Sequence, residues 1–230
     1  MASILRVLAL GSLLVLATSC VGTPIPQPPA LDPPDADRIA YEMAGSLTAL
    51  VGAPGAALPG TTLWGVNLDD VLDPQTTVVN ADGSFSLAVS ALPGQELRVQ
   101  TRDGDDRSRP VDLLVPRGEL VRPTEDCLRF EPARELRRPA IDVGVADRQR
   151  VRLTNGCGAD VVIDEVVLRR PSDAWSVATP GPITVPAGAS TDLEVVFQAP
   201  RAGPYEEILF VVVGAPEPDR RPITLSGEGR

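Results

Sequence analysis

The stretch Ser84-Phe85-Ser86-Leu87-Ala88-Val89-Ser90 alternates large apolar residues with small ones without a break. Successive side chains of a β-strand point to opposite faces, so its phenylalanine, leucine and valine would share one buried face. Asn80-Ala81-Asp82-Gly83 precedes the stretch and Leu92-Pro93-Gly94 follows it, and both are turn signals. The stretch therefore predicts a half-buried strand of an antiparallel sheet.

Short stretches of the same kind occur on both sides of this strand. They are GSLTALV (45–51), TTLWGVNL (61–68), TTVV (76–79), ELRVQTR (96–102) and VDLLV (111–115). Turns rich in glycine and proline separate them, as expected for a domain built of short strands. We therefore predict a first β module at residues 44–116.

A second set of strand-like stretches follows a predicted linker at residues 117–126 (RGELVRPTED). It predicts a second β module at 127–230, with strands LRFEP (128–132), AIDVGV (140–145), RQRVRLTN (148–155), DVVIDEVVLR (160–169), WSVAT (175–179), PITVPA (182–187), STDLEVVFQA (190–199), YEEILFVVVG (205–214) and RPITLSGEG (221–229). Val161–Leu168 and Glu207–Val213 are nearly unbroken apolar runs, which is typical of central strands.

Two family resemblances support this division. Ala81–Leu87, followed by Pro93–Val99, resembles bacterial Ig-like and carboxypeptidase-regulatory-like domains. The second module is similar to the abnormal-spindle/Hydin (ASH-type) Ig-like domain, which also occurs in bacterial choice-of-anchor proteins. Its landmarks appear here in order as Leu128–Pro132, Val151–Asn155, Val185–Ser190, Val195–Pro200, Ala202-Gly203 and Ile223–Gly229. The resemblances imply an all-β fold of two tandem Ig-like β-sandwiches, and they say little about a ligand.

The first 20 residues have the pattern of a lipoprotein signal. Arg6 supplies the positive charge, an apolar run extends from Val7 to Leu16, and small residues follow. Ala17-Thr18-Ser19-Cys20 resembles a bacterial lipobox, which implies cleavage after residue 19 and acylation of Cys20. The alternative is an ordinary signal peptide with a chance cysteine at its end. By the same resemblance, Val21 in place of an aspartate favours the outer membrane over the inner membrane.

Residues 20–43 are assigned to the lipidated Cys20 and a tether. Val21–Asp37 contains six prolines and little that could build a core, so it predicts an extended spacer between bilayer and folded modules. Asp37–Met43 could form a helical turn.

The composition excludes several functions. The chain has no histidine, every basic residue is arginine, and the net charge is −10. These facts argue against histidine-dependent catalysis, histidine-ligated zinc and nucleic-acid binding. No motif singles out a pair of catalytic carboxylates. We therefore expect no catalytic residue, no cofactor and no nucleic-acid partner.

Cys127 and Cys157 are the two thiols that remain once Cys20 is lipidated. A pair in an oxidising compartment predicts a disulfide between the first strand of the second module and a later Gly-Cys-Gly turn. Two free thiols are the alternative.

The sequence contains two acidic clusters and three arginine pairs. Asp69-Asp70 with Asp73, and Asp103-Gly104-Asp105-Asp106, could hold Ca²⁺, but neither has the full spacing of a calcium loop, and solvated turns explain them better. We therefore expect no metal site. Three arginine pairs are expected to form surface ion pairs: Arg137-Arg138, Arg169-Arg170 and Arg220-Arg221.

The sequence thus predicts a non-catalytic lipoprotein of the bacterial envelope or cell surface, attached to the membrane by its N-terminal lipid. Its Ig-like modules would serve a structural role or bind a protein partner, which the sequence does not identify. The alternative is an accessory or spacer subunit of a secreted enzyme or of an envelope transport assembly.

Overall fold

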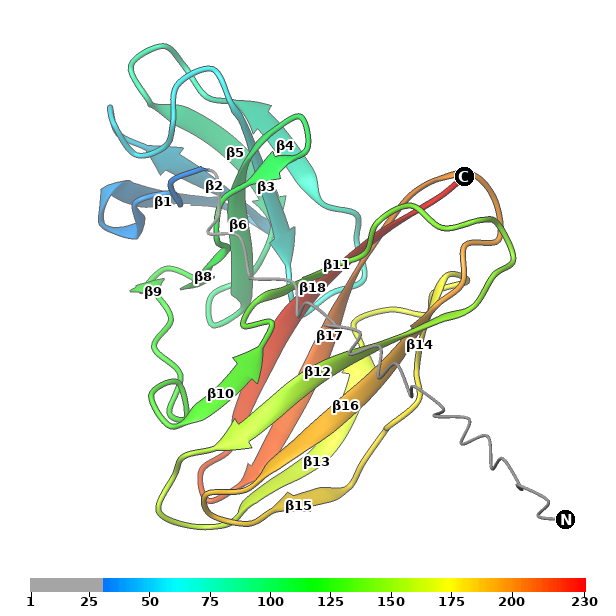
Figure 1. Ribbon diagram of the computed structural model, residues 1–230. Coiled ribbons are helices and arrows are strands. Elements are labelled where there is room, and N and C mark those ends of the chain that lie inside the picture. The colour runs from blue at the N-terminus through cyan, green and yellow to red at the C-terminus, as the bar shows by residue number, and fades with distance from the viewer. Residues whose placement is uncertain (1–30) are drawn as a thin grey trace, which may run out of the picture.

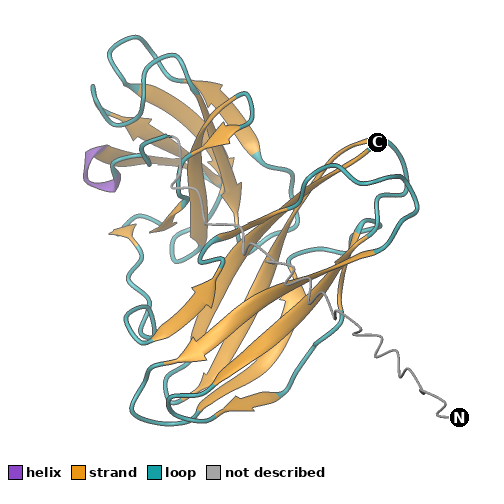
Figure 2. Cartoon of the chain, viewed as in Figure 1, coloured by secondary structure: helices purple, strands orange, loops and turns teal. Residues whose placement is uncertain are grey.

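The computed structural model describes residues 31–230 (Figures 1 and 2). This part of the chain is built of β-strands, apart from the single 3-10 turn η1 (Ala36–Arg38). No helix within it is long and apolar enough to cross a membrane. The predicted signal peptide, Cys20 and the proline-rich stretch up to residue 30 lie outside the described residues.

The first module contains two antiparallel sheets. The smaller sheet has the order β1-β2-β5, with β1 at Ile39–Ala44, β2 at Leu47–Gly52 and β5 at Phe85–Ser90. The larger has the order β4-β3-β6-β8-β9, with β7 also paired to β6; the strands are β3 (Thr62–Asn67), β4 (Gln75–Val78), β6 (Glu96–Asp103), β7 (Asp106–Arg107), β8 (Val111–Leu114) and β9 (Gly118–Glu119).

Alternating residues of these sheets form the core of the first module. On β5, Phe85, Leu87 and Val89 are buried, which confirms the half-buried strand expected from its alternation. They pack in one cluster with residues of the larger sheet, among them Leu97 and Val99 of β6. The first module is therefore a sandwich of two sheets, as predicted.

The first module begins earlier than the sequence suggested. Strand β1 starts at Ile39, within the predicted tether, and no helical turn occupies residues 39–43. The turn η1 instead lies at Ala36–Arg38, where the carboxylate of Asp35 accepts a hydrogen bond from the N–H of Asp37. The stretch becomes a strand because Ile39 enters the core while β1 pairs along its length with β2.

The second module is also a sandwich of two sheets. One sheet has the order β10-β12-β16-β14, with β10 (Leu128–Glu131), β12 (Asp147–Asn155), β14 (Trp175–Val177) and β16 (Ser190–Phe197). The other has the order β11-β18-β17-β13-β15, with β11 (Glu135–Arg137), β13 (Val161–Leu168), β15 (Ile183–Val185), β17 (Gly203–Ala215) and β18 (Asp219–Gly229). Only the pair β11–β18 is parallel among the described strands.

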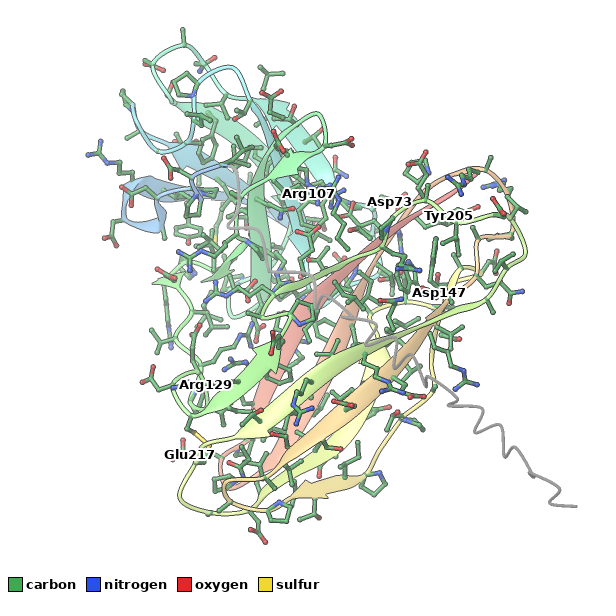
Figure 3. All side chains as sticks on the ribbon, viewed as in Figure 1. Asp73, Arg107, Arg129, Asp147, Tyr205 and Glu217 are labelled. Carbon is green, nitrogen blue, oxygen red and sulfur yellow. A yellow bond between two sulfur atoms is a disulfide. The ribbon has the colours of Figure 1, made fainter. Side chains whose placement is uncertain are left out.

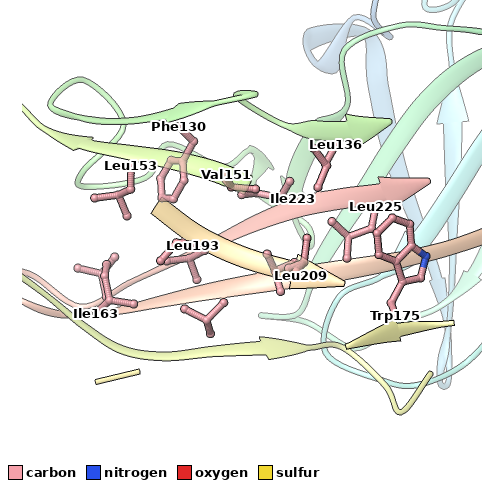
Figure 4. Close-up of a cluster of buried hydrophobic side chains, with 14 of the residues drawn as sticks. Phe130, Leu136, Val151, Leu153, Ile163, Trp175, Leu193, Leu209, Ile223 and Leu225 are labelled. Atoms are coloured by element: carbon pink, nitrogen blue, oxygen red, sulfur yellow. The ribbon is translucent and has the colours of Figure 1, made fainter. Parts of the chain in front are cut away.

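Large aliphatic and aromatic side chains from both sheets fill the core of this module (Figure 4). The rings of Trp175 and Phe197 lie with centroids 4.5 Å apart, and Tyr205 meets Phe197 edge-on at 6.0 Å. The predicted central position of β13 and β17 is confirmed, because each has a strand neighbour on both sides.

The predicted strand at residues 140–145 is wrong. Only Ile141 makes an isolated bridge there, to Gly229. Gly144 takes a left-handed conformation (φ +79°), and Val143 and Val145 point into solvent. Strand β11, at Glu135–Arg137, pairs with β18 instead.

Candidate functional site

Cys127 and Cys157 form a disulfide with an S–S distance of 2.01 Å. The bridge joins the residue before β10 to the loop after β12, and these two strands are neighbours in one sheet. The predicted pairing is confirmed. Cys20, the predicted lipidation site, lies outside the described residues.

In the first acidic cluster, Asp69 and Asp73 pair with arginines of the second module. Asp69 accepts a hydrogen bond from Arg220 at 2.7 Å, and Asp73 accepts one from Arg170 at 2.5 Å. No group of three metal-binding side chains occurs within residues 31–230. The second acidic stretch forms the tight turn between β6 and β7, where Gly104 has a φ of +55°.

The prediction that Arg169 forms a surface ion pair is wrong, because its side chain is buried. Its side chain is only 3% exposed, and its guanidinium donates to the backbone carbonyls of Asn67 (3.0 Å), Asp70 (2.9 Å) and Leu72 (3.1 Å). Burial lowers the pKa of Arg169 below its ordinary value. Arg169 therefore fixes the loop after β3 of the first module against the second module.

The other arginine pairs divide between the surface and the inter-module contact. Arg138 pairs with Asp147 of its own module, whereas Arg137, which is 52% exposed, pairs with Asp105 of the first module. The other pairs, Arg170 and Arg220 among them, bond across the two modules, and Arg221 is largely buried. Figure 3 labels Asp73 and also Arg107, which donates a hydrogen bond to Glu206 of the second module at 3.0 Å.

The contact between the modules is formed by sheet faces that point away from the two cores. The sequence does not predict that these faces are buried. On β6, Leu97 and Val99 enter the core of the first module, whereas Arg98, Gln100 and Arg102 point the other way. All three donate hydrogen bonds to the second module. Arg98 donates to Pro222 and Thr224. Gln100 donates to Glu135, and Arg102 donates to Glu206. The larger sheet of the first module is thus covered on both faces.

Arg98 lies at the centre of this contact, and its side chain is 1% exposed. It binds Asp112 of β8 through two bonds, of 2.7 and 3.0 Å. It also donates to the carbonyl of Pro222 (2.7 Å) and to Oγ1 of Thr224 (3.2 Å) on β18. Burial acts to raise the pKa of Asp112, but Arg98 and Arg122 outweigh it and hold this pKa below its ordinary value.

The predicted linker is part of the same contact rather than a free connection. Arg122 and Thr124 are buried. Arg122 binds Glu96 (3.0 Å) and Asp112 (3.2 Å) of the first module, and it also donates to the backbone carbonyl of Arg220. Burial acts to lower the pKa of Arg122, but the carboxylates of Asp112 and Glu96 raise it above its ordinary value.

An apolar cluster completes the contact. Trp64, Val66 and Leu68 of the first module pack against Ile208 and Phe210 of β17. Two guanidinium groups stack on its rings, with Arg102 4.1 Å from the centroid of Trp64 and Arg220 4.6 Å from that of Phe210. Such stacking is worth about 0.5–2 kcal/mol per pair, depending on desolvation.

The fold and this contact define an all-β protein of two tandem β-sandwiches joined sheet to sheet. No family model matches the sequence, and no curated protein is similar to it in sequence.

Several solved structures resemble the chain at low identity. An ASH/PapD-like domain of human CEP192 (PapD-like domain 7) shares 13% identity at a TM-score of 0.41, over 48% of this chain and 90% of that one. A protein of unknown function from Porphyromonas gingivalis W83 shares 12% at 0.37, over 86% and 99%. The D0-D1 domain of intimin shares 11% at 0.27, over 83% and 92%.

Proposed function

We propose that the chain is an exported, non-catalytic lipoprotein that acyl groups on Cys20 hold in the bacterial envelope, with the outer membrane favoured. Its two Ig-like modules are displayed as one rigid body for structural or protein-interaction purposes. The proline-rich stretch after Cys20 spaces this body from the bilayer.

The observation that carries the proposal is the buried contact between the modules. In a chain of independent modules, Arg98 of β6 and Arg169 after β13 would be exposed to water, whereas here both side chains are buried and bonded across the contact. Charged groups with this many partners stay in place, because moving one leaves another buried and unpaired. A body of fixed shape suits display or spacing. The Cys127–Cys157 disulfide supports export, since disulfides persist in oxidising compartments.

Intact-mass analysis of protein extracted from membranes tests this proposal. The expected product begins at Cys20, carries acyl groups, and contains the Cys127–Cys157 disulfide. A Cys20→Ser variant should lose the acyl groups and leave the membrane fraction, whereas Ser19→Ala should behave as the parent. Recovery of the unprocessed chain from the cytosol would refute the proposal.

Co-purification separates two forms of the proposal. A stoichiometric enzyme or transporter that accompanies the detergent-extracted protein would assign it an accessory or spacer role. Any other bound protein, or none, would support display at the envelope.

A further inference from the structure

We propose that the free edge of β5, with the groove beside it, binds an extended polypeptide segment that carries a basic side chain. This inference rests on the proposed interaction role and assigns it a site and a kind of partner.

The register of the small sheet shows which backbone groups are free. The N–H of Ala91 donates to the carbonyl of Ser46 at 3.0 Å, so this pair belongs to the hydrogen-bonded set of the ladder. Antiparallel pairs alternate, so the backbone groups of Ser86, Ala88 and Ser90 point away from β2. The carbonyl of Ser90 accepts from Nδ2 of Asn67 at 2.7 Å on this outer side. The N–H and C=O of Ala88 have no partner within residues 31–230.

A groove of about 330 Å³ opens at this edge. It is lined by Ala88 and Ser90 of β5, by Asn67 at the end of β3, by Gln75 at the start of β4, and by Leu72 in the loop between those two strands. Leu47 of β2 also lines it, and the side chains of Leu47 and Leu72 are about half exposed. Exposed apolar residues beside a free strand edge are the setting in which proteins add a strand from a partner.

The charge of the groove indicates the partner. Asp70 and Asp73 line it, and each also pairs with an arginine of the second module that does not line the groove, Asp70 with Arg169 at 3.7 Å and Asp73 with Arg170 at 2.5 Å. The carboxylate of Asp73 is 81% exposed, and its hydrogen bond from Arg170 lowers its pKa, so it is ionised at neutral pH. An extended segment would pair its backbone with Ala88, place an apolar side chain against Leu47 and Leu72, and offer an arginine or lysine to Asp73.

Fluorescence anisotropy with the purified full chain tests this inference. The probe is a labelled hexapeptide of alternating valine and threonine with an arginine at each end. Two comparison peptides have glutamate at the ends, or N-methyl groups on alternate backbone amides. Ala88→Pro removes an N–H that faces the groove and takes no part in the ladder with β2, a position where edge strands tolerate proline.

Met43→Pro is the matched control. The N–H of Ala53 donates to the carbonyl of Arg38, so Met43 belongs to the set of β1 residues whose backbone groups face outward, at the other edge of the same sheet. Asp73→Asn tests the charge separately and does not depend on a backbone change.

The arginine peptide should bind saturably and about tenfold more tightly than the glutamate or N-methylated peptide. Ala88→Pro should weaken binding about tenfold and Asp73→Asn about threefold, while Met43→Pro stays within about twofold of the parent. Equal affinities for the three peptides, equal binding by parent and Ala88→Pro, or no saturation would overturn the inference. A lipidated envelope protein that fails to bind refutes this inference alone, whereas an unprocessed cytosolic chain refutes the proposed function alone.

Discussion

Arg98 lies between Leu97 and Val99, two residues of a hydrophobic core, yet its own guanidinium is buried against a different module. Strand β6 contributes to both the core and the inter-module contact because successive side chains point to opposite faces of the sheet, and both faces are covered. Asp112 makes this burial tolerable by accepting two charge-assisted hydrogen bonds from Arg98.

Arg98→Met is expected to lower the free energy of unfolding by about 3–5 kcal/mol, because it leaves the Asp112 carboxylate buried with one cationic partner fewer. Chemical denaturation measures the change. Arg148→Met is the control, since the side chain of Arg148 is 70% exposed and its loss should change stability by no more than about 0.5 kcal/mol. Equal effects of the two substitutions would contradict the role of Arg98.

Asp112 predicts a specific dependence of stability on pH. Its pKa is lowered in the folded protein, so its contribution is present above the unfolded value of about 3.9 and is lost as pH falls through the lower folded value. The difference in unfolding free energy between the parent and Asp112→Asn should therefore be constant near neutral pH and should shrink below about pH 4. Denaturation at a series of pH values checks this, and a difference that grows on acidification would be the wrong sign.

At the scale of elements, the disulfide fixes the start of β10 to the end of β12. It closes a loop with a sequence separation of 30 residues. By the loop-entropy relation, its removal should cost about 3–4 kcal/mol of unfolding free energy. Denaturation of the parent and of a Cys127→Ala/Cys157→Ala variant measures the cost. Reductant should destabilise the parent and leave the variant unchanged; a variant as stable as the oxidised parent would show that the bridge adds nothing.

Strand β18 passes close beneath an aromatic ring. A Cβ at Gly227 would lie 2.7 Å from the ring of Phe197, in the core of the second module. Gly227→Ala should therefore destabilise the protein by about 1–3 kcal/mol through overpacking. Gly158→Ala is the matched control, because nothing lies within 4 Å of its added Cβ. Thermal unfolding measures the stability of both variants. A Gly227→Ala variant as stable as Gly158→Ala would show that the core can accommodate the added methyl group, and would contradict the prediction.

At the scale of the whole molecule, the sequence predicts each sandwich better than the contact between them. Alternation on β5 shows which of its faces is buried, and the apolar run of Glu207–Val213 indicates burial on both faces of β17. This apolar run does not indicate which part of the protein covers the face of β17 that points away from the core of the second module. The contact remained unpredicted because many of its residues are arginines and carboxylates, which in a sequence are typical of solvent-exposed positions.

Arg169 and Arg122 illustrate what was missed. Arg169 binds backbone carbonyls that lie 97 to 102 residues away in the sequence, and Arg122 binds a backbone carbonyl 98 residues away as well as Glu96, 26 residues away. No residue pattern marks a backbone carbonyl as a partner. The available signal for the contact was in ELRVQTR (96–102), where Arg98, Gln100 and Arg102 alternate with Leu97, Val99 and Thr101. The start of β1 was missed for a different reason, since the prolines before it suggested that the tether continued.

The central claim is that the buried contact holds the two modules in one fixed orientation. Pulsed electron-spin distance measurement between labels on Val78→Cys in the first module and Arg150→Cys in the second tests it most directly, with Cys20→Ser to prevent labelling at that position. Both residues are exposed. The account predicts a single distance distribution as narrow as that of an intra-module pair, Arg150→Cys with Thr184→Cys. A broad distribution for the inter-module pair, beside a narrow one for the control, would contradict it.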